Sequence, residues 1–205
     1  MKLIAMTDDS HSVHELASKI SSIHLLIDYI HIREKSKTAH EILSLLDLLQ
    51  QQGVNKEKIV IHDRLDIALK TDNPNIHLPS HGIPVRIVRA TYPHLRIGRS
   101  VHSLSEAKQA EADGADYVLY GHCFETKCKE GIVPNGVHNL IDIKKELQIP
   151  VFAIGGITPE RVCQLQEAKA DGIAIMSGIF ASANPFESAL ILSKKCQEHE
   201  NENYL

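Results

Sequence analysis

The chain has no long run of a single kind of residue, and this excludes several classes of protein. In its 205 residues no apolar stretch approaches the roughly 20 residues that cross a membrane. Basic residues never occur five in succession and the formal net charge is -4, so the sequence lacks the positive patch with which nucleic-acid-binding proteins neutralise phosphates. The first ten residues lack the apolar core and cleavage site of a signal peptide. We therefore expect a cytoplasmic protein that binds neither nucleic acid nor membrane.

Cysteine is also scarce, with four residues and no C-x-x-C pair: Cys123, Cys128, Cys163 and Cys196. In a reducing compartment such residues are expected to be thiols rather than the frame of a disulfide-stabilised fold. A zinc site at Cys123 and Cys128 beside His122 is an alternative. A C-x4-C spacing without a second pair is a weak zinc motif, so we expect no metal.

What the sequence does contain is a repeating pattern of short apolar runs. Hydrophobic residues make up 43% and charged residues 23%, enough for one domain with a substantial core and no disordered composition. Runs rich in Ile and Val recur about every 20 to 30 residues, with helical periodicity between them, which is typical of βα units. The expected strands are Lys2–Met6, Leu26–Ile32, Lys58–Ile61, Ile76–Leu78, Arg96–Val101, Tyr117–Tyr120, Val151–Ile154 and Gly172–Met176.

Helix start and stop signals lie between these runs. Thr38–Gln52 has Thr38 as cap with Glu41 three residues on, and Gly53 ends it. Ser103–Asp113 repeats the pattern, with Glu106 expected to complete a capping box. Pro159 stands at the first position of another helix, and four prolines between positions 71 and 93 predict a short or irregular fourth helix. The last helix is expected over 185–198, followed by a polar tail over 199–205.

Eight strands with nearly continuous apolar character predict a parallel sheet covered by helices. We expect a single-domain α/β protein, a (β/α)8 TIM barrel over residues 1–198, because eight units fit tightly into 205 residues. A doubly wound open sheet is the alternative, and periodicity alone does not separate the two.

Unusual residues gather where the strands end, which is the working face of any parallel β/α fold. Gly155 and Gly156 follow one strand, and Ser177 and Gly178 follow the next. Loops after the seventh and eighth strands of barrels often bind a phosphate through backbone amides, so we expect a phosphate site here; the alternative is that the glycines only make a tight turn.

Two cations follow the second expected strand. Arg33 and Lys35 flank Glu34, so in an extended segment their side chains point the same way and, with Lys129, would neutralise an anion. The alternative is ordinary solvated surface charge.

His122 directly follows Gly121 at the end of the sixth expected strand. Histidine can both accept and give up a proton near neutral pH, which makes it a candidate catalytic residue. The chain has thirteen histidines and most are expected at the surface. His62, His77, His81 and His102 also lie near the expected mouth of the barrel, but without a neighbouring glycine loop.

These motifs, in their order along the chain, give a resemblance that covers nearly the whole length. They are Thr7-Asp8, Arg33-Glu34-Lys35, Asp63-Arg64, the segment from Ile97 to His102, Gly114 to Tyr117, Gly121 to Lys129, and Ala153 to Ile157. The chain resembles the thiamin phosphate synthase family. The resemblance implies a (β/α)8 barrel that joins a thiazole phosphate to a pyrimidine pyrophosphate with magnesium.

The chain departs from this family at three places. It has His62-Asp63 where members have Asn-Asp, and Pro79-Ser80-His81-Gly82 where members have Gly-Gln-x-Asp, so the second magnesium-binding acid is missing. Magnesium is bound by hard oxygen ligands, commonly one or two carboxylates with the substrate's phosphates, so this loss is expected to cripple synthesis. At position 122 a histidine replaces the family's proline.

This combination is similar to the TenI branch of the family, the thiazole tautomerases. The resemblance implies an isomerase that aromatises a 2-carboxy-4-methyl-5-ylidene-thiazoline ethyl phosphate, with His122 moving the proton and with no cofactor. Gly155, Gly156, Ser177 and Gly178 would hold the phosphate.

The remaining polar residues of the predicted site would orient the substrate's carboxylate and ring: Arg33, Lys35, Thr126, Lys127 and Lys129. Which of Arg33, Lys35 and Lys127 meets the carboxylate stays open. The alternatives are thiamin phosphate synthesis itself, or a regulatory protein that binds thiamin intermediates without turnover. A homodimer or higher homo-oligomer is compatible with the sequence, which does not determine the oligomeric state.

Overall fold

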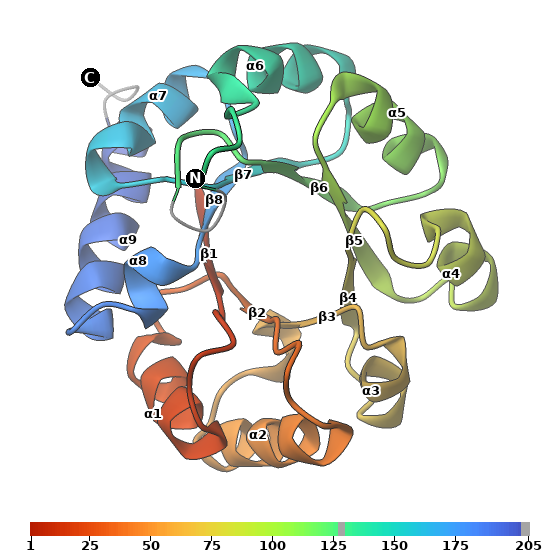
Figure 1. The fold of residues 1–205 in the computed structure, drawn as a ribbon, viewed down its shortest axis with the longest axis vertical. Helices are drawn as coiled ribbons and strands as arrows, with labels where there is room; N and C mark the ends of the chain where they lie inside the picture. The colour runs from red at the N-terminus through yellow and green to blue at the C-terminus, as the bar shows by residue number, and fades with distance from the viewer. Residues whose placement is uncertain (127–129, 202–205) are drawn as a thin grey trace.

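The chain folds into a closed barrel of eight parallel strands surrounded by helices (Figure 1). The computed structural model describes residues 1–126 and 130–201. Each strand pairs with its neighbours in sequence, and β1 pairs with β8 through Leu3 opposite Ile173, which closes the sheet. The (β/α)8 barrel expected from the sequence is therefore confirmed, and the open-sheet alternative is wrong.

All eight expected strands are present. They are β1 (Lys2–Met6), β2 (Tyr29–Ile32), β3 (Ile59–His62), β4 (Asn75–Leu78), β5 (Arg96–Val101), β6 (Tyr117–Gly121), β7 (Val151–Ile154) and β8 (Gly172–Ile175).

The second strand begins three residues later than expected, at Tyr29 instead of Leu26, because the Leu26 amide still closes a turn on Ile23. The third is displaced by one residue, since Lys58 ends a short 3-10 helix, η1 (Lys56–Lys58), and His62 joins the strand.

Helices follow the strands and cover the outside of the barrel. They are α1 (Val13–Ile23), α2 (Ala39–Gln51), α3 (Leu65–Lys70), α4 (Val85–Thr91), α5 (Leu104–Ala112), α6 (Gly136–Glu146), α7 (Val162–Glu167), α8 (Ser177–Phe180) and α9 (Pro185–Asn201), with the 3-10 turn η3 (Pro159–Arg161) before α7. Helix α4 has only 7 residues, as the prolines predict. Helix α9 continues three residues beyond the expected end at 198, and residues 202–205 of the expected tail lie outside the described residues.

Side-chain oxygens fix the starts of several helices. Thr38 accepts from the Glu41 amide while Glu41 accepts from the Thr38 amide, so the expected capping box of α2 is present. In α5 the box is incomplete: Ser103 caps the helix, but the Glu106 carboxylate accepts at 2.7 Å from the amide of His102 instead of that of Ser103. The expected box at Ser103 is therefore only half formed.

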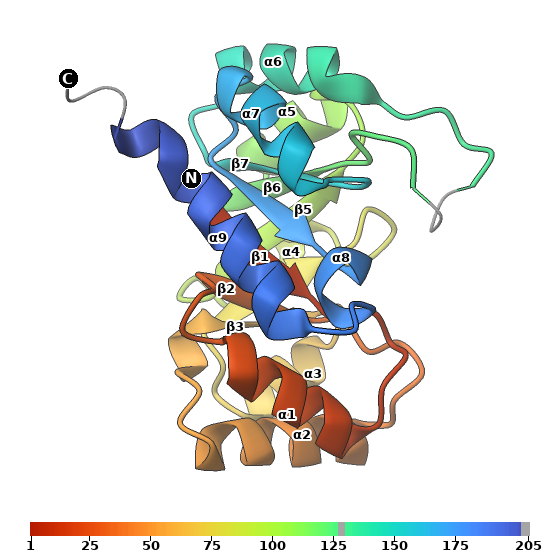
Figure 2. The same cartoon turned by 90° about the vertical axis from the view of Figure 1, so that its left-hand side faces the viewer.

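The strands separate two apolar regions. Alternate strand residues point outward and pack under the helices in the large core. The others point into the barrel, where Ile4, Met6, Leu119, Phe152 and Ala174 form a second cluster with Tyr117. Figure 2 shows connections after the strands leaving on the side where α8 lies. Residues of these connections line the candidate site. Among the described residues, no helix is both long and apolar enough to cross a bilayer.

Candidate active site

A cavity of about 410 Å³ opens at the carboxyl ends of the strands. This volume lies in the range of small-molecule binding sites. Residues from all eight strands or from the loops after them line it: Met6, Arg33, Lys35, His62, Pro79, Ser80, His81, Ser100, His102, Leu119, Gly121, His122, Thr126, Ile154, Gly155, Gly156, Ile157, Ala174, Ile175, Met176, Ser177 and Gly178. Eight of the ten residues expected from the sequence to form the site are among them.

Arg33 and Lys35 reach this cavity from the loop after β2. The Arg33 amide donates to the Oγ1 of Thr7, a buried residue that follows β1, at 2.8 Å. Glu34 between them turns into the protein, where its carboxylate accepts from Lys37 at 2.5 Å. Because alternate side chains of an extended segment point to opposite sides, both cations face one wall of the cavity.

Gly155 and Gly156 form another wall of the cavity, at the end of β7. Both have positive φ, 103° and 65°. A Cβ on Gly155 would lie 2.3 Å from the Cβ of His122, and one on Gly156 would lie 2.3 Å from the carbonyl oxygen of Glu125. Only glycine fits both positions, because neither the backbone angle nor the space admits a side chain.

The two glycine carbonyls are held by neighbouring residues. Phe124 donates its amide to the Gly155 carbonyl at 3.0 Å, and the Arg161 guanidinium donates to the Gly156 carbonyl at 2.6 Å. The C=O and N–H of one peptide point in opposite directions, so the Gly156 amide faces away from the loop that contains Phe124. The glycine loop is therefore fixed while its surface toward the cavity stays available.

Ser177 and Gly178 begin α8 on the same side of the cavity and are exposed. The first amides of a helix have no partner within the helix. These amides, with the neighbouring glycine loop, make this wall suited to a phosphate.

His122 lies in the cavity wall directly after β6 and is 4% exposed. Its Nε2 is 3.2 Å from the carbonyl oxygen of Ile132, which can only accept. In the neutral form of the ring this contact assigns the proton to Nε2 and leaves the lone pair on Nδ1. Nδ1 is buried and has no hydrogen-bond partner in the described chain. Asn135 fixes the loop by bonding the backbone of both Gly121 and His122.

The remaining predicted site residues are less well defined. Thr126 lines the cavity. Lys127 and Lys129 lie outside the described residues, as does Cys128 of the alternative zinc site. Cys123 is buried, and burial raises the pKa of its thiol to about 12.

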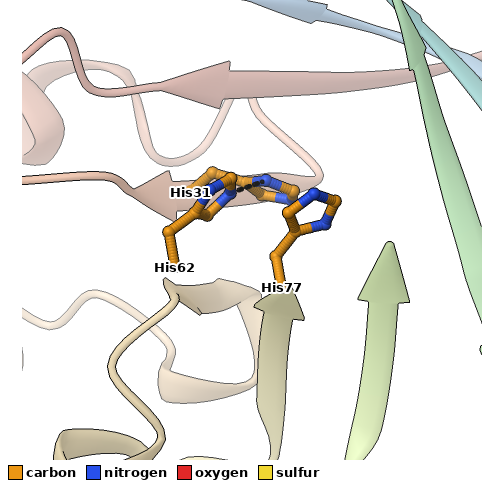
Figure 3. A group of neighbouring side chains, drawn as sticks. All are labelled: His31, His62 and His77. Carbon is orange, nitrogen blue, oxygen red and sulfur yellow. Dashed lines mark hydrogen bonds between the residues drawn. The ribbon is translucent and has the colours of Figure 1, made fainter. Parts of the chain in front are cut away.

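Below the cavity lies a group of histidines that the sequence did not reveal as a group. His31 of β2, His62 of β3 and His77 of β4 turn their rings toward one another inside the barrel (Figure 3). Burial is the main reason that the pKa of His31 lies well below its usual value, and electrostatic repulsion from His77 and Arg96 lowers this pKa further. Burial and the charge of Arg99 lower the pKa of His77 to about 3.

The strand pattern offered one signal for this group. Tyr29 and His31, and likewise Asn75 and His77, stand two residues apart, which places each pair on one face of its strand. The face that points into a barrel holds few polar residues, so a histidine there is unusual.

Magnesium does not fit the lining of this cavity. No carboxylate is found among the described lining residues, whereas Mg²⁺ requires hard oxygen ligands. The nearest acid after β3 is Asp63, an exposed residue whose Oδ1 faces Gly82 in the loop after β4. Pro79, Ser80 and His81, which stand in that loop, bring no acid to the cavity.

Comparison with known proteins identifies the family. The family model described as thiamine monophosphate synthase matches residues 3–179. The chain belongs to this family. The thiamine-phosphate synthase of Pyrococcus furiosus is 30% identical over 203 residues, which is 97% of this chain and 96% of that protein. That of Chloroflexus aurantiacus is 38% identical over 143 residues, 69% of this chain and 65% of that protein.

Solved structures agree with this membership. Thiamine phosphate pyrophosphorylase from Pyrococcus furiosus superposes with a TM-score of 0.82 at 28% identity, covering 96% of each chain. A 3-hexulose-6-phosphate synthase, at 16% identity and a TM-score of 0.75, shares the fold alone.

The family relationship corrects the activity expected from the sequence. The prediction of a thiazole tautomerase, an isomerase, is wrong, because relatives that align along 69 to 97% of the chain are named thiamine-phosphate synthase, a transferase. The comparisons do not test which residues act in the site, so the catalytic role of His122 stays a prediction. The prediction gave one substitution, histidine for proline at position 122, more weight than the similarity of the whole chain. A buried imidazole with an unpaired Nδ1 can accept a hydrogen bond as readily as it can move a proton.

Proposed function

We propose that the chain is a thiamine-phosphate synthase, a transferase that joins a thiazole phosphate to a pyrimidine pyrophosphate and releases pyrophosphate. Family membership and the names of the long-aligned relatives support this reaction. The observation that carries it is one cavity with two walls suited to anions, the glycine wall and the cation wall. The reaction brings together two phosphorylated substrates, and the cavity offers each of them a place. The biosynthetic family supports the cytoplasm as its location.

The thiazole phosphate is assigned to the glycine wall. Gly155, Gly156, Ser177 and Gly178 present backbone amides there without an intervening side chain. Amides held in a fixed loop bind a phosphate with little loss of conformational freedom, because Phe124 and Arg161 already hold the loop carbonyls.

The pyrophosphate is assigned to the cation wall. Negative charge grows on the leaving pyrophosphate as its bond to the pyrimidine breaks, and Arg33 and Lys35 lie on the same side of the cavity, where their charges stabilise it. The guanidinium of Arg33 can bond two phosphate oxygens at once, while Lys35 contributes a point charge. No step of this mechanism is assigned to magnesium.

We assign to His122 the role of binding the part of the substrate that lies between the two walls. Nδ1 is the acceptor, because the Ile132 carbonyl holds Nε2 as the donor. Since Nδ1 is buried, the side chain must rotate for this nitrogen to reach the substrate. Thr126 borders the same region of the cavity. In this role His122 orients the substrate. The thiazole nitrogen bonds to the methylene carbon of the pyrimidine while the bond from that carbon to the pyrophosphate oxygen breaks, and this exchange needs no proton transfer by the protein.

The experiment separates the two walls by calorimetric titration with each substrate alone. Gly156→Val should weaken binding of thiazole phosphate by about a hundredfold, because its Cβ would meet the Glu125 carbonyl oxygen and displace the loop amides. Binding of the pyrimidine pyrophosphate should stay within a few-fold of that of wild type. Arg33→Gln should have the reverse effect. It should weaken binding of the pyrimidine pyrophosphate by about ten- to a hundredfold and leave binding of thiazole phosphate nearly unchanged. Gly53→Ala and Lys56→Gln, both remote from the cavity, are the matched controls. Equal binding of both substrates by wild type and both cavity variants would overturn the assignment.

A further inference from the structure

The three interior histidines form a compact set of nitrogen ligands. His31, His62 and His77 each offer one ring nitrogen, and these nitrogens all lie within 4.8 Å of one another. They come from three adjacent strands, and His62 and His77 are direct partners in the pairing of β3 with β4. Figure 3 shows the rings converging from these strands. Strands of a closed sheet hold their relative positions firmly, so the cluster is preformed.

The separation of the nitrogens suits a single small ion. In a tetrahedral site with Zn–N bonds of about 2.0–2.1 Å, neighbouring ligand nitrogens lie roughly 3.3 Å apart. His31 Nδ1 and His62 Nε2 are already 2.7 Å apart. The separations in the set do not exceed 4.8 Å, so the rings must rotate to bring all three nitrogens to this spacing.

The surroundings hold the rings in place and leave one atom without a partner. His77 makes contacts of 3.2 Å from Nδ1 to the Tyr117 hydroxyl and 2.8 Å from Nε2 to Ser100 Oγ, so one nitrogen can turn to an ion while the other keeps a hydroxyl that orients the ring. His31 Nε2 is buried and has no hydrogen-bond partner in the described chain, but the nitrogen of His31 that faces His62 is Nδ1, so an ion held beside His62 would bind Nδ1.

The cluster also has an entrance and a side open to ligands. His31 and His77 are fully buried, whereas His62 is partly exposed and lines the main cavity. An ion held by the three rings would therefore have its remaining coordination position toward the cavity. Three protein ligands with one open position are typical of catalytic rather than structural zinc sites.

We propose that His31, His62 and His77 bind one divalent transition-metal ion, of the nitrogen-preferring class represented by Zn²⁺, at the floor of the cavity. The all-imidazole set selects this class over Mg²⁺ and Ca²⁺, which prefer oxygen. The site is independent of the synthase assignment, because none of its ligands belongs to either anion-binding wall.

The nearby charge sets how tightly the ion is held. No carboxylate belongs to the described cluster, and Arg96 lies beneath it, over the rings of Tyr29 and Tyr117 at 4.5 and 4.4 Å. The faces of these rings offset part of the guanidinium charge. The absence of a carboxylate from the cluster makes the site weaker than one with a carboxylate behind each ligand.

The test uses Co²⁺ as a spectroscopic probe on chelator-treated full-length protein. Wild type should bind one equivalent and give the visible d–d bands of a four- or five-coordinate ion, and Zn²⁺ should displace it. His62→Gln should weaken Co²⁺ binding by more than about tenfold, and His77→Asn should do the same. His138→Gln, on the exposed face of α6, is the control and should bind as wild type does.

His62 is the first variant to make because it is partly exposed and least needed for packing. Circular dichroism of each variant establishes that it is folded before titration. Wild-type protein without these bands at one equivalent, or a folded His62→Gln variant with unchanged affinity and bands, would overturn the proposal. X-ray absorption of the zinc-loaded protein should show three nitrogen neighbours at about 2.0–2.1 Å, and a shell of oxygen alone would also contradict it.

Discussion

Single residues inside the barrel carry polar groups in a place where water has little access. His31 and His77 are fully buried, and burial disfavours the charged form of an imidazole. The unfolded chain exposes the same rings to water, where their pKa is about 6.5. Folding is therefore linked to the release of protons below that pH.

This linkage predicts an acid-sensitive fold. The pKa of His77 is about 3 in the folded protein, so between that value and about 6.5 the unfolded chain binds the extra proton. The contribution of His77 to stability is then complete above about pH 6.5 and is lost as the pH falls, at about 1.4 kcal/mol per pH unit. His31 and His62 have pKa values lowered in the same direction and steepen the loss.

Urea unfolding of chelator-treated protein at pH 7.5, 6 and 5 measures this slope. The His77→Asn variant should show a shallower loss of unfolding free energy with acid, whatever its absolute stability. His138→Gln should keep the wild-type slope, because that side chain is 87% exposed. A wild-type free energy of unfolding that stays constant from pH 7.5 to 5 would contradict the burial of neutral imidazoles.

Two cysteines should differ sharply in reactivity. Cys123 is 2% exposed and its thiol has a pKa of about 12, so it presents almost no thiolate at neutral pH. Cys163 is exposed at the start of α7. Brief iodoacetamide treatment of the native protein, read by peptide mass spectrometry, should label Cys163 and leave Cys123 unmodified until denaturant is added. If Cys123 in the native protein were labelled as fast as Cys163, the burial of Cys123 would be contradicted.

At the level of elements, local sequence signals predicted existence and type better than boundaries. Short Ile- and Val-rich runs were sufficient to identify every strand. The start of β2 was misplaced because Leu26 and Ile27 are apolar yet lie in the turn after α1. Periodicity reports burial, and buried residues also occur in turns. Glu106 fits the capping-box spacing, but its carboxylate accepts a hydrogen bond from the amide of His102. Which amide it bonds depends on the path of the chain before the helix.

The cap of α2 allows a direct test of element stability. Thr38→Ala removes the side-chain oxygen that accepts from the Glu41 amide and should lower the free energy of unfolding by about 1 kcal/mol. Ser22→Ala, at an exposed position near the end of α1, should change it by less than about 0.5 kcal/mol. Equal effects of the two substitutions in denaturant unfolding would contradict the capping role of Thr38.

For the whole molecule, the closed barrel explains why distant motifs form one site. Closing the sheet brings the ends of β2, β6, β7 and β8 around one cavity. The glycine pair and the two cations were predictable because each motif stands at the end of a strand. The histidine cluster was not, because His31 and His77 stand within runs that otherwise indicate apolar strands, and their meeting depends on the register between β2, β3 and β4.

The activity was the least predictable property from single residues. A histidine at position 122 and a missing acid after β4 suggested an isomerase, whereas the similarity of the whole chain to its relatives supports a transferase. Residue chemistry at one position is compatible with several reactions.

The central claim is that this cavity joins two phosphorylated substrates, and product formation tests it most directly. Purified protein is mixed with thiazole phosphate and pyrimidine pyrophosphate, with and without added Mg²⁺, and thiamine phosphate is measured by mass spectrometry with released pyrophosphate in the same samples. The account predicts thiamine phosphate and pyrophosphate in equal amounts over many turnovers, and about a hundredfold less of both with Gly156→Val at subsaturating thiazole phosphate. Binding of both substrates with no thiamine phosphate formed under either condition would contradict it.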